Sequence, residues 1–102
     1  MLHTVNKSPL ERNAFDSCLA HAKPGSAILL IEDGVYGAVM GTAAAKHLAA
    51  AMKDIAVYAL QADIDMRGMQ GRLIDGVRLV DYGGFVDLVT QHQGTQSWLS
   101  AL

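Results

Sequence analysis

Cys18 is the one cysteine of the 102-residue sequence and its only candidate nucleophile. A thiolate can accept sulfur from a persulfide and pass it on, which no other side chain here does well. Free cysteine is also among the most buried residue types, and Cys18 lies near the middle of the apolar face of an expected helix, between Ala14 and Leu19. Cys18 could therefore be a sulfur-accepting site or an inert core thiol, and the sequence pattern alone favours the core thiol.

Metal and nucleotide chemistry find little support in the sequence. The four histidines are scattered, and none is paired at the spacing that zinc sites use. Gly34, Gly37 and Gly41 follow an expected strand, but their spacing matches neither the dinucleotide-binding nor the P-loop pattern, and turn or packing roles are favoured. We therefore expect no metal and no other cofactor.

Glu32 and Asp33 form the second candidate site, because they directly follow an expected buried strand. The carboxyl ends of strands are where α/β sheets place their ligand crevices. Next to Gly34, the same two residues could equally form a turn and place negative charge at a helix N-terminus, which capping and macrodipole preferences favour. Both roles remain open, with the structural one favoured.

Apolar runs and helical stretches alternate along the chain. Four runs are expected to be strands, namely Leu2–Val5, Ala27–Ile31, Ile55–Leu60 and Val77–Val80. This alternation predicts an α/β domain with a mostly parallel sheet. We expect a single domain spanning residues 1–102.

The segments between these runs carry helix signals. Ser8, Pro9 and Glu11 form a capping box at the start of the first helix. Thr42 is expected to cap an alanine-rich helix that follows it. Further helices are expected at Asp63–Arg67, closed by Gly68, and around Phe85–Val89, with an apolar tail that docks on the domain or on a neighbour.

Composition restricts the class of function. Hydrophobic residues make up 51% of the chain and charged residues 18%, so either the core is dense or a partner covers part of the surface. The net charge is −2 and no basic block occurs, which argues against direct nucleic-acid binding. The sequence contains no apolar run that could span a bilayer and no signal-peptide pattern, so we expect a cytoplasmic protein.

Four local strings, taken together and in order, resemble the DsrH/TusB family. They are the N-terminal Leu2–Pro9, the strand with its Asp-Gly turn at Leu29–Tyr36, the Asp-Tyr-x-x-Phe-Val stretch at Asp81–Leu88, and the closing Gln96–Leu99. The resemblance covers nearly the whole chain. It implies a three-layer α/β/α fold of the DsrE/DsrF/DsrH type.

The resemblance also implies partners and a sulfur-relay function. The family's complex is a dimer of heterotrimers with DsrE-like and DsrF-like chains (TusD and TusC in the tRNA branch), and it exchanges sulfur with a DsrC/TusE-like carrier. One branch serves intracellular sulfur oxidation, and the other serves 2-thiolation of the wobble uridine in tRNA. Cys18 matches a position where DsrH-type chains carry a cysteine, so the sequence favours sulfur oxidation. A purely structural subunit of either complex is the alternative, since the principal sulfur-accepting cysteine belongs to the DsrE-like partner.

Overall fold

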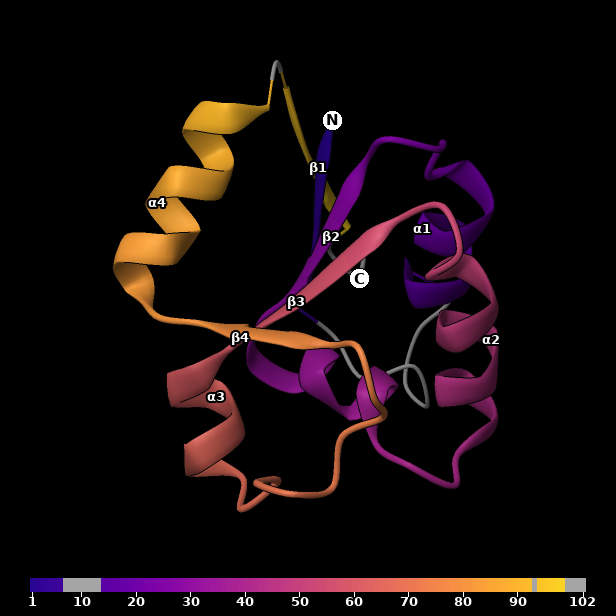
Figure 1. Ribbon diagram of the computed structural model, residues 1–102, viewed down its shortest axis with the longest axis vertical. Coiled ribbons are helices and arrows are strands. Elements are labelled where there is room, and N and C mark those ends of the chain that lie inside the picture. The colour runs from indigo at the N-terminus through magenta and orange to yellow at the C-terminus, as the bar shows by residue number, and fades with distance from the viewer. Residues whose placement is uncertain (7–13, 93, 99–102) are drawn as a thin grey trace.

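A five-stranded parallel sheet organises the chain (Figure 1). The computed structural model describes residues 1–6, 14–92 and 94–98. Within these residues the strand order is β4-β3-β2-β1-β5, and every neighbouring pair is parallel. The strands are β1 (Leu2–Val5), β2 (Ala27–Leu30), β3 (Ala56–Leu60), β4 (Arg78–Val80) and β5 (Thr95–Trp98).

Helices lie on both sides of this sheet, which confirms the predicted α/β fold class. They are α1 (Ala14–His21), the 3₁₀ helix η1 (Glu32–Ala38), α2 (Ala43–Ala51), α3 (Gln61–Met66) and α4 (Tyr82–Gln91). In Figure 1, α1 and α2 lie side by side on the right of the sheet, and α4 lies at the upper left with α3 below it. Within the described residues, each of the strands β1 to β4 is connected to the next strand by a helical crossover, as parallel pairing requires.

The two faces of the sheet carry cores of unequal size. The larger cluster lies on the α1 and α2 side and comprises Val5, Cys18, Ile28, Leu30, Val35, Ala38, Leu48, Ile55, Val57, Ala59 and Ile64. The smaller cluster lies under α4 and has four buried members, namely Leu2, Ala27, Leu29 and Leu88. Because β1 and β2 are buried at every position, they read as apolar runs in the sequence rather than as alternating patterns.

Side-chain caps fix the starts of two helices. The Thr42 hydroxyl accepts a hydrogen bond from the Ala45 N–H at 3.1 Å, which confirms the predicted cap of α2. The Asp81 carboxylate accepts one from the Gly84 N–H at 2.7 Å, so α4 begins at Tyr82. The sequence placed the start of this last helix after Gly84, because two adjacent glycines disfavour helix, and the Asp81 cap overrides that tendency.

Other predictions on the elements had mixed outcomes. The tail was expected to dock on the domain or on a neighbour, and its described part belongs to a strand, Thr95–Trp98, that pairs with β1 of the same domain. A short helix before Gly68 is confirmed as α3, and Gly68 adopts the left-handed conformation that ends such helices. The capping box at Ser8, Pro9 and Glu11 lies outside the described residues.

Gly34 is required where η1 crosses the end of β1. A β-carbon at this position would collide with the Val5 carbonyl, since it would lie 2.8 Å from the carbonyl carbon and closer still to the oxygen. The backbone of η1 can approach β1 this closely only without a side chain.

We predict that Gly34→Ala lowers the free energy of unfolding by about 2–3 kcal/mol, because the methyl group must displace the backbone of a buried strand. Urea denaturation followed by circular dichroism measures the change. Gly83→Ala is the control, because its β-carbon would meet only the Asp81 carboxylate at 3.4 Å and alanine favours helix. Equal unfolding midpoints for the two variants would contradict the close approach.

Candidate functional site

Cys18 lies on α1 and points into the larger core. Only 1% of its surface is exposed, and it packs within the cluster formed with Val5, Ile28 and Leu48. Burial raises the pKa of the Cys18 thiol to about 12, because the thiolate would lose its hydration. In this conformation the side chain is a protonated core thiol, which corresponds to the structural alternative of the sequence interpretation.

The described histidines form no catalytic or metal-binding group with Cys18. His3 is buried in β1 as expected, and its pKa is lowered mainly by burial and further by the nearby N-terminal ammonium group. The His92 ring contacts the Leu88 carbonyl oxygen through Nδ1 at 2.8 Å. In the described part of the chain, no three His, Cys, Asp or Glu side chains come together as metal ligands would.

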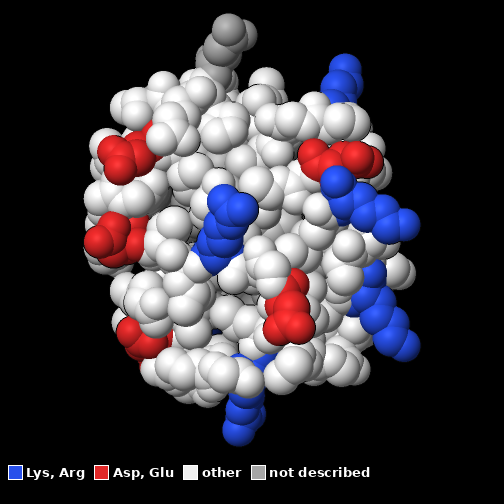
Figure 2. Space-filling view, viewed as in Figure 1, with Lys and Arg blue, Asp and Glu red and all other residues white. Residues whose placement is uncertain are grey.

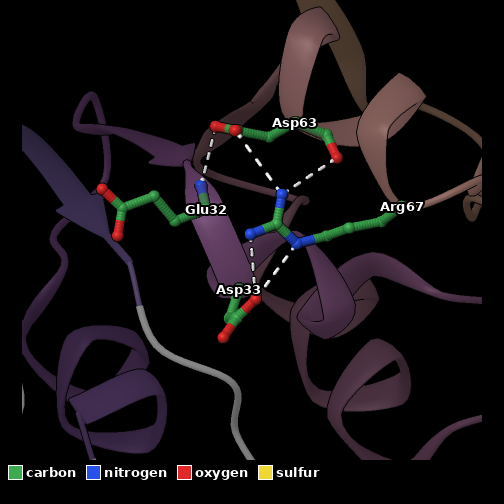
Figure 3. A network of polar contacts seen from close by, with 4 residues as sticks. All are labelled: Glu32, Asp33, Asp63 and Arg67. Atoms are coloured by element: carbon green, nitrogen blue, oxygen red, sulfur yellow. Dashed lines mark hydrogen bonds and ion pairs between the residues drawn. The ribbon is translucent and has the colours of Figure 1, made fainter.

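The most connected polar cluster lies at the carboxyl end of the sheet (Figure 3). Arg67, the residue that directly follows α3, donates from Nε to Asp33 Oδ1 at 3.0 Å, and its Nη2 pairs with the same oxygen at 2.9 Å. Its Nη1 lies 3.5 Å from Asp63 Oδ1. The other carboxylate oxygen of Asp63 accepts the backbone N–H of Glu32 at 2.7 Å. One guanidinium therefore bridges two carboxylates and joins η1 to α3.

Glu32 is held in a strained conformation by this cluster. The backbone angle φ of Glu32 is +49°, in a region that non-glycine residues seldom occupy. Among the described residues, Glu32 is the only non-glycine residue with a positive φ. The bond from its N–H to Asp63 and the bond from Gly34 N–H to Ile31 O fix the turn from β2 into η1. In Figure 3 the Glu32 carboxylate points away from the other three side chains.

The two carboxylates singled out in the sequence therefore have different surroundings. Asp33 is ion-paired, in agreement with the structural role, whereas Glu32 has a constrained backbone and a carboxylate outside the network. Sequence reasoning missed Asp63 and Arg67. Their spacing of four residues on a short helix was a signal for an ion pair, but it gave no indication of Asp33 as the third member.

A shallow cavity of about 430 Å³ lies between α3, the following loop and β4. Its apolar lining comes from Met40, Ile64, Leu73, Ile74, Val77 and Leu79, and its polar lining from Gln70 and Asp75. It contains no pair of acid and base groups and no nucleophile. Its composition suits contact with an apolar side chain rather than catalysis.

The surface carries scattered charges between wide uncharged areas. On the face shown in Figure 2, the acidic side chains lie mainly toward the side where Figure 1 places α4, and the basic ones mainly toward the opposite side. Several large apolar side chains are exposed, including Met40, Met66, Tyr82 and Val86. None of the described helices is long and apolar enough to cross a membrane.

Comparison with solved structures defines the class of protein as a small parallel α/β domain of known fold. The ychN protein of E. coli superposes with a TM-score of 0.70 at 16% identity, covering 94% of this chain and 97% of that one. A protein of unknown function from Methanobacterium thermoautotrophicum superposes with a TM-score of 0.72 at 14% identity, over 94% and 96% of the two chains.

Sequence comparison then identifies the family. The family model described as DsrH like protein matches residues 7–95. "Protein TusB" of Pectobacterium parmentieri is 34% identical over 98 residues, and "Protein TusB" of Escherichia coli (strain K12 / DH10B) is 37% identical over the same length. In both cases the match covers 96% of this chain and 100% of the relative. The chain belongs to the DsrH/TusB family, as its local strings predicted.

We predict that Cys18 of the folded protein reacts with a disulfide reagent at pH 8 only through unfolding. With a pKa of about 12, roughly one thiol in ten thousand is ionised at that pH, and the side chain is covered. Absorbance of the released aromatic thiol follows the reaction, and the protein in 6 M guanidinium gives the full signal. Stoichiometric labelling of the folded protein within seconds would contradict a core thiol.

We predict that Asp63→Ala destabilises the fold more than Asp33→Ala. The Asp63 side chain is 14% exposed and serves both Arg67 and the Glu32 N–H, whereas that of Asp33 is 45% exposed and serves Arg67 alone. The expected losses are about 2 kcal/mol and under about 1 kcal/mol respectively, since exposed ion pairs contribute little. Urea titrations of the two variants measure both losses in the free energy of unfolding. A larger loss for Asp33→Ala than for Asp63→Ala would contradict the prediction.

Proposed function

We propose that this chain is a subunit of a cytoplasmic sulfur-relay complex that serves 2-thiolation of the wobble uridine in tRNA. The observation that carries the proposal is the similarity to proteins named TusB, at 34% and 37% identity over their whole length. The sequence strings around Cys18, Asn6 and Glu32 favoured the sulfur-oxidation branch instead. That preference is not confirmed, and the relatives support the tRNA branch better.

In the proposed complex the chain assembles with DsrE-like and DsrF-like chains, the TusD-like and TusC-like subunits, as a dimer of heterotrimers. A DsrC/TusE-like carrier exchanges sulfur with the assembly. Two features are consistent with a subunit that has partners. Large apolar side chains such as Met66 and Tyr82 are exposed, and the core under α4 has few buried members.

Within that complex we assign the chain a supporting role rather than that of principal sulfur acceptor. In each transfer step a thiolate attacks the outer sulfur of a persulfide, a new S–S bond forms, and the donor leaves as a thiolate. The acceptor must be ionised and accessible. Cys18 is neither in this structure, so the thiolate of the acceptor comes from a partner chain or the carrier.

The arrangement of η1 and α3 supports the same role. Arg67 is ion-paired with both Asp33 and Asp63 at the carboxyl end of the sheet, so its guanidinium is not available to lower the pKa of a partner's thiol. The chain's contribution is therefore the shape of its surface rather than a charge or a nucleophile.

The test is complementation of a bacterial strain that lacks its own TusB. Expressed together with the TusD-like and TusC-like chains of its organism, this chain is expected to restore 2-thiouridine in tRNA, measured by mass spectrometry of digested nucleosides. Cys18→Ala is expected to restore at least half of the wild-type level, since alanine fits the core without adding a polar group.

Two outcomes would change the assignment. Restoration by wild type but not by Cys18→Ala, with the complex still assembled, would make Cys18 the essential acceptor. Assembly without any 2-thiouridine, together with sulfane sulfur transfer to a DsrC-like carrier in vitro, would move the chain to the sulfur-oxidation branch.

A further inference from the structure

Strand β4 is an edge of the sheet whose outer side has no strand partner among the described residues. It stands at one end of the strand order, and β3 is its single neighbour there. The ladder to β3 uses one side of the β4 backbone, so the N–H and C=O groups on the other side point away from the sheet. In Figure 1 no helix is drawn in front of β4. These backbone groups are therefore available to an added strand.

The side chains along β4 present two different faces. Because successive residues of a strand point to opposite sides of the sheet, Val77 and Leu79 share one side, and Arg78 and Val80 share the other. Val77 packs against the larger core and Val80 against the smaller one, in agreement with this alternation. Leu79 is nevertheless 44% exposed. The edge thus carries an uncovered apolar side chain on one face and an arginine on the other.

The cavity between α3, the following loop and β4 lies directly beside this edge. Val77 and Leu79 belong to its lining, together with the buried Ile64 of α3. Gln70 and Asp75, both exposed, supply its polar lining. Its volume of about 430 Å³ accommodates one large apolar side chain. A segment paired with β4 would place every second side chain on the side of this cavity.

Arg78 restricts what this segment can be. Its side chain is exposed and belongs to no ion pair of the described chain, whereas Arg67 is paired with two carboxylates. Asp81, the acidic residue that follows β4, accepts the Gly84 N–H instead. On an added strand, the neighbour of the residue at the cavity faces the side where Arg78 lies. A carboxylate at that position would pair with the guanidinium.

A second copy of this chain fits the edge less well. In a symmetric antiparallel pair centred on Leu79, the middle residue of β4, Arg78 of one copy lies opposite Val80 of the other. The two Arg78 side chains are then diagonal neighbours on one face, within reach of one another and of like charge. A different chain with a carboxylate at that place is therefore favoured.

We propose that the β4 edge, defined as Val77, Arg78 and Leu79, is the binding site for an extended segment of a different protein of the relay. That segment adds to the sheet as a further strand, inserts an apolar side chain into the cavity and pairs an adjacent Asp or Glu with Arg78. The inference rests on the proposed function in that the partner is a subunit or the carrier of the same complex. Backbone hydrogen bonds supply the affinity, and the cavity and Arg78 supply the specificity.

The first test is amide hydrogen exchange on the complex purified with the DsrE-like and DsrF-like chains of the same organism, with and without the DsrC-like carrier. Exchange in residues 77–80 is expected to slow about tenfold relative to the chain alone, because outward N–H groups become hydrogen-bonded. Unchanged exchange of this segment in both mixtures overturns the added strand.

The second test reverses the charge at the edge. Arg78→Glu is expected to remove most of this slowing at low salt, because it places like charges together. Lys46→Glu is the matched control, since it makes the same change of charge at an exposed position on α2, and its exchange is expected to match wild type. Urea titration checks that both variants keep the wild-type stability. Full protection of β4 in Arg78→Glu contradicts the ion pair with the partner.

The third test identifies the occupant without altering β4. A photoreactive phenylalanine analogue at Gln70, in the lining of the cavity, is expected to crosslink to a partner segment in which an apolar residue adjoins Asp or Glu. Peptide mass spectrometry identifies that segment. A crosslink to a second copy of this chain, or to a segment without an acidic residue, overturns the proposed occupant.

The outcomes separate this inference from the proposed function. A chain that restores 2-thiouridine in the complementation test while β4 exchanges freely in the complex overturns the strand site alone. A chain whose β4 is protected in the complex but that restores no 2-thiouridine overturns the assignment to tRNA thiolation and leaves the strand site in place.

Discussion

The burial of β1 and β2 on both faces is the constraint on which the rest of the structure depends. Every residue of these two strands is buried, including the polar His3 and Thr4 of β1, so helices must cover both sides of the sheet. The charged residues Glu32 and Asp33 lie in the turn that directly follows β2. Gly34 then allows η1 to lie against the end of β1. The bridge through Arg67 is thus a consequence of how tightly the centre of the sheet is enclosed.

The same tight packing keeps the only thiol of the chain away from the protein surface. Cys18 belongs to the larger core, and its thiol is kept protonated by the absence of water rather than by any charged neighbour. The accessible surface carries large apolar side chains, such as Met66 and Tyr82, and scattered charges. In the proposed relay complex, a protein built in this way would act through its surface rather than through its buried thiol.

Much of this architecture was predictable from the sequence. The four apolar runs gave four strands, Thr42 gave a cap, and the helical spacing around Cys18 indicated a core thiol. The fifth strand was not predictable, because Thr95-Gln96-Ser97 has no apolar run and its β conformation comes from pairing with β1. The bridge was not predictable either, since Asp33 and Arg67 are 34 residues apart and only the parallel crossover brings them together.

The position of β5 has a consequence for how the chain acquires its structure during synthesis. Strand β1 precedes the other described strands in the chain and is also the neighbour of the last described strand, since Leu2 pairs with Thr95 and Val5 with Trp98. One edge of β1 therefore lacks its β5 partner until the other four described strands and β5 itself have been translated. During that interval an unpaired, apolar edge is available to other chains. Production of the subunit at the same time and place as its partners would shorten the period in which that edge can pair incorrectly.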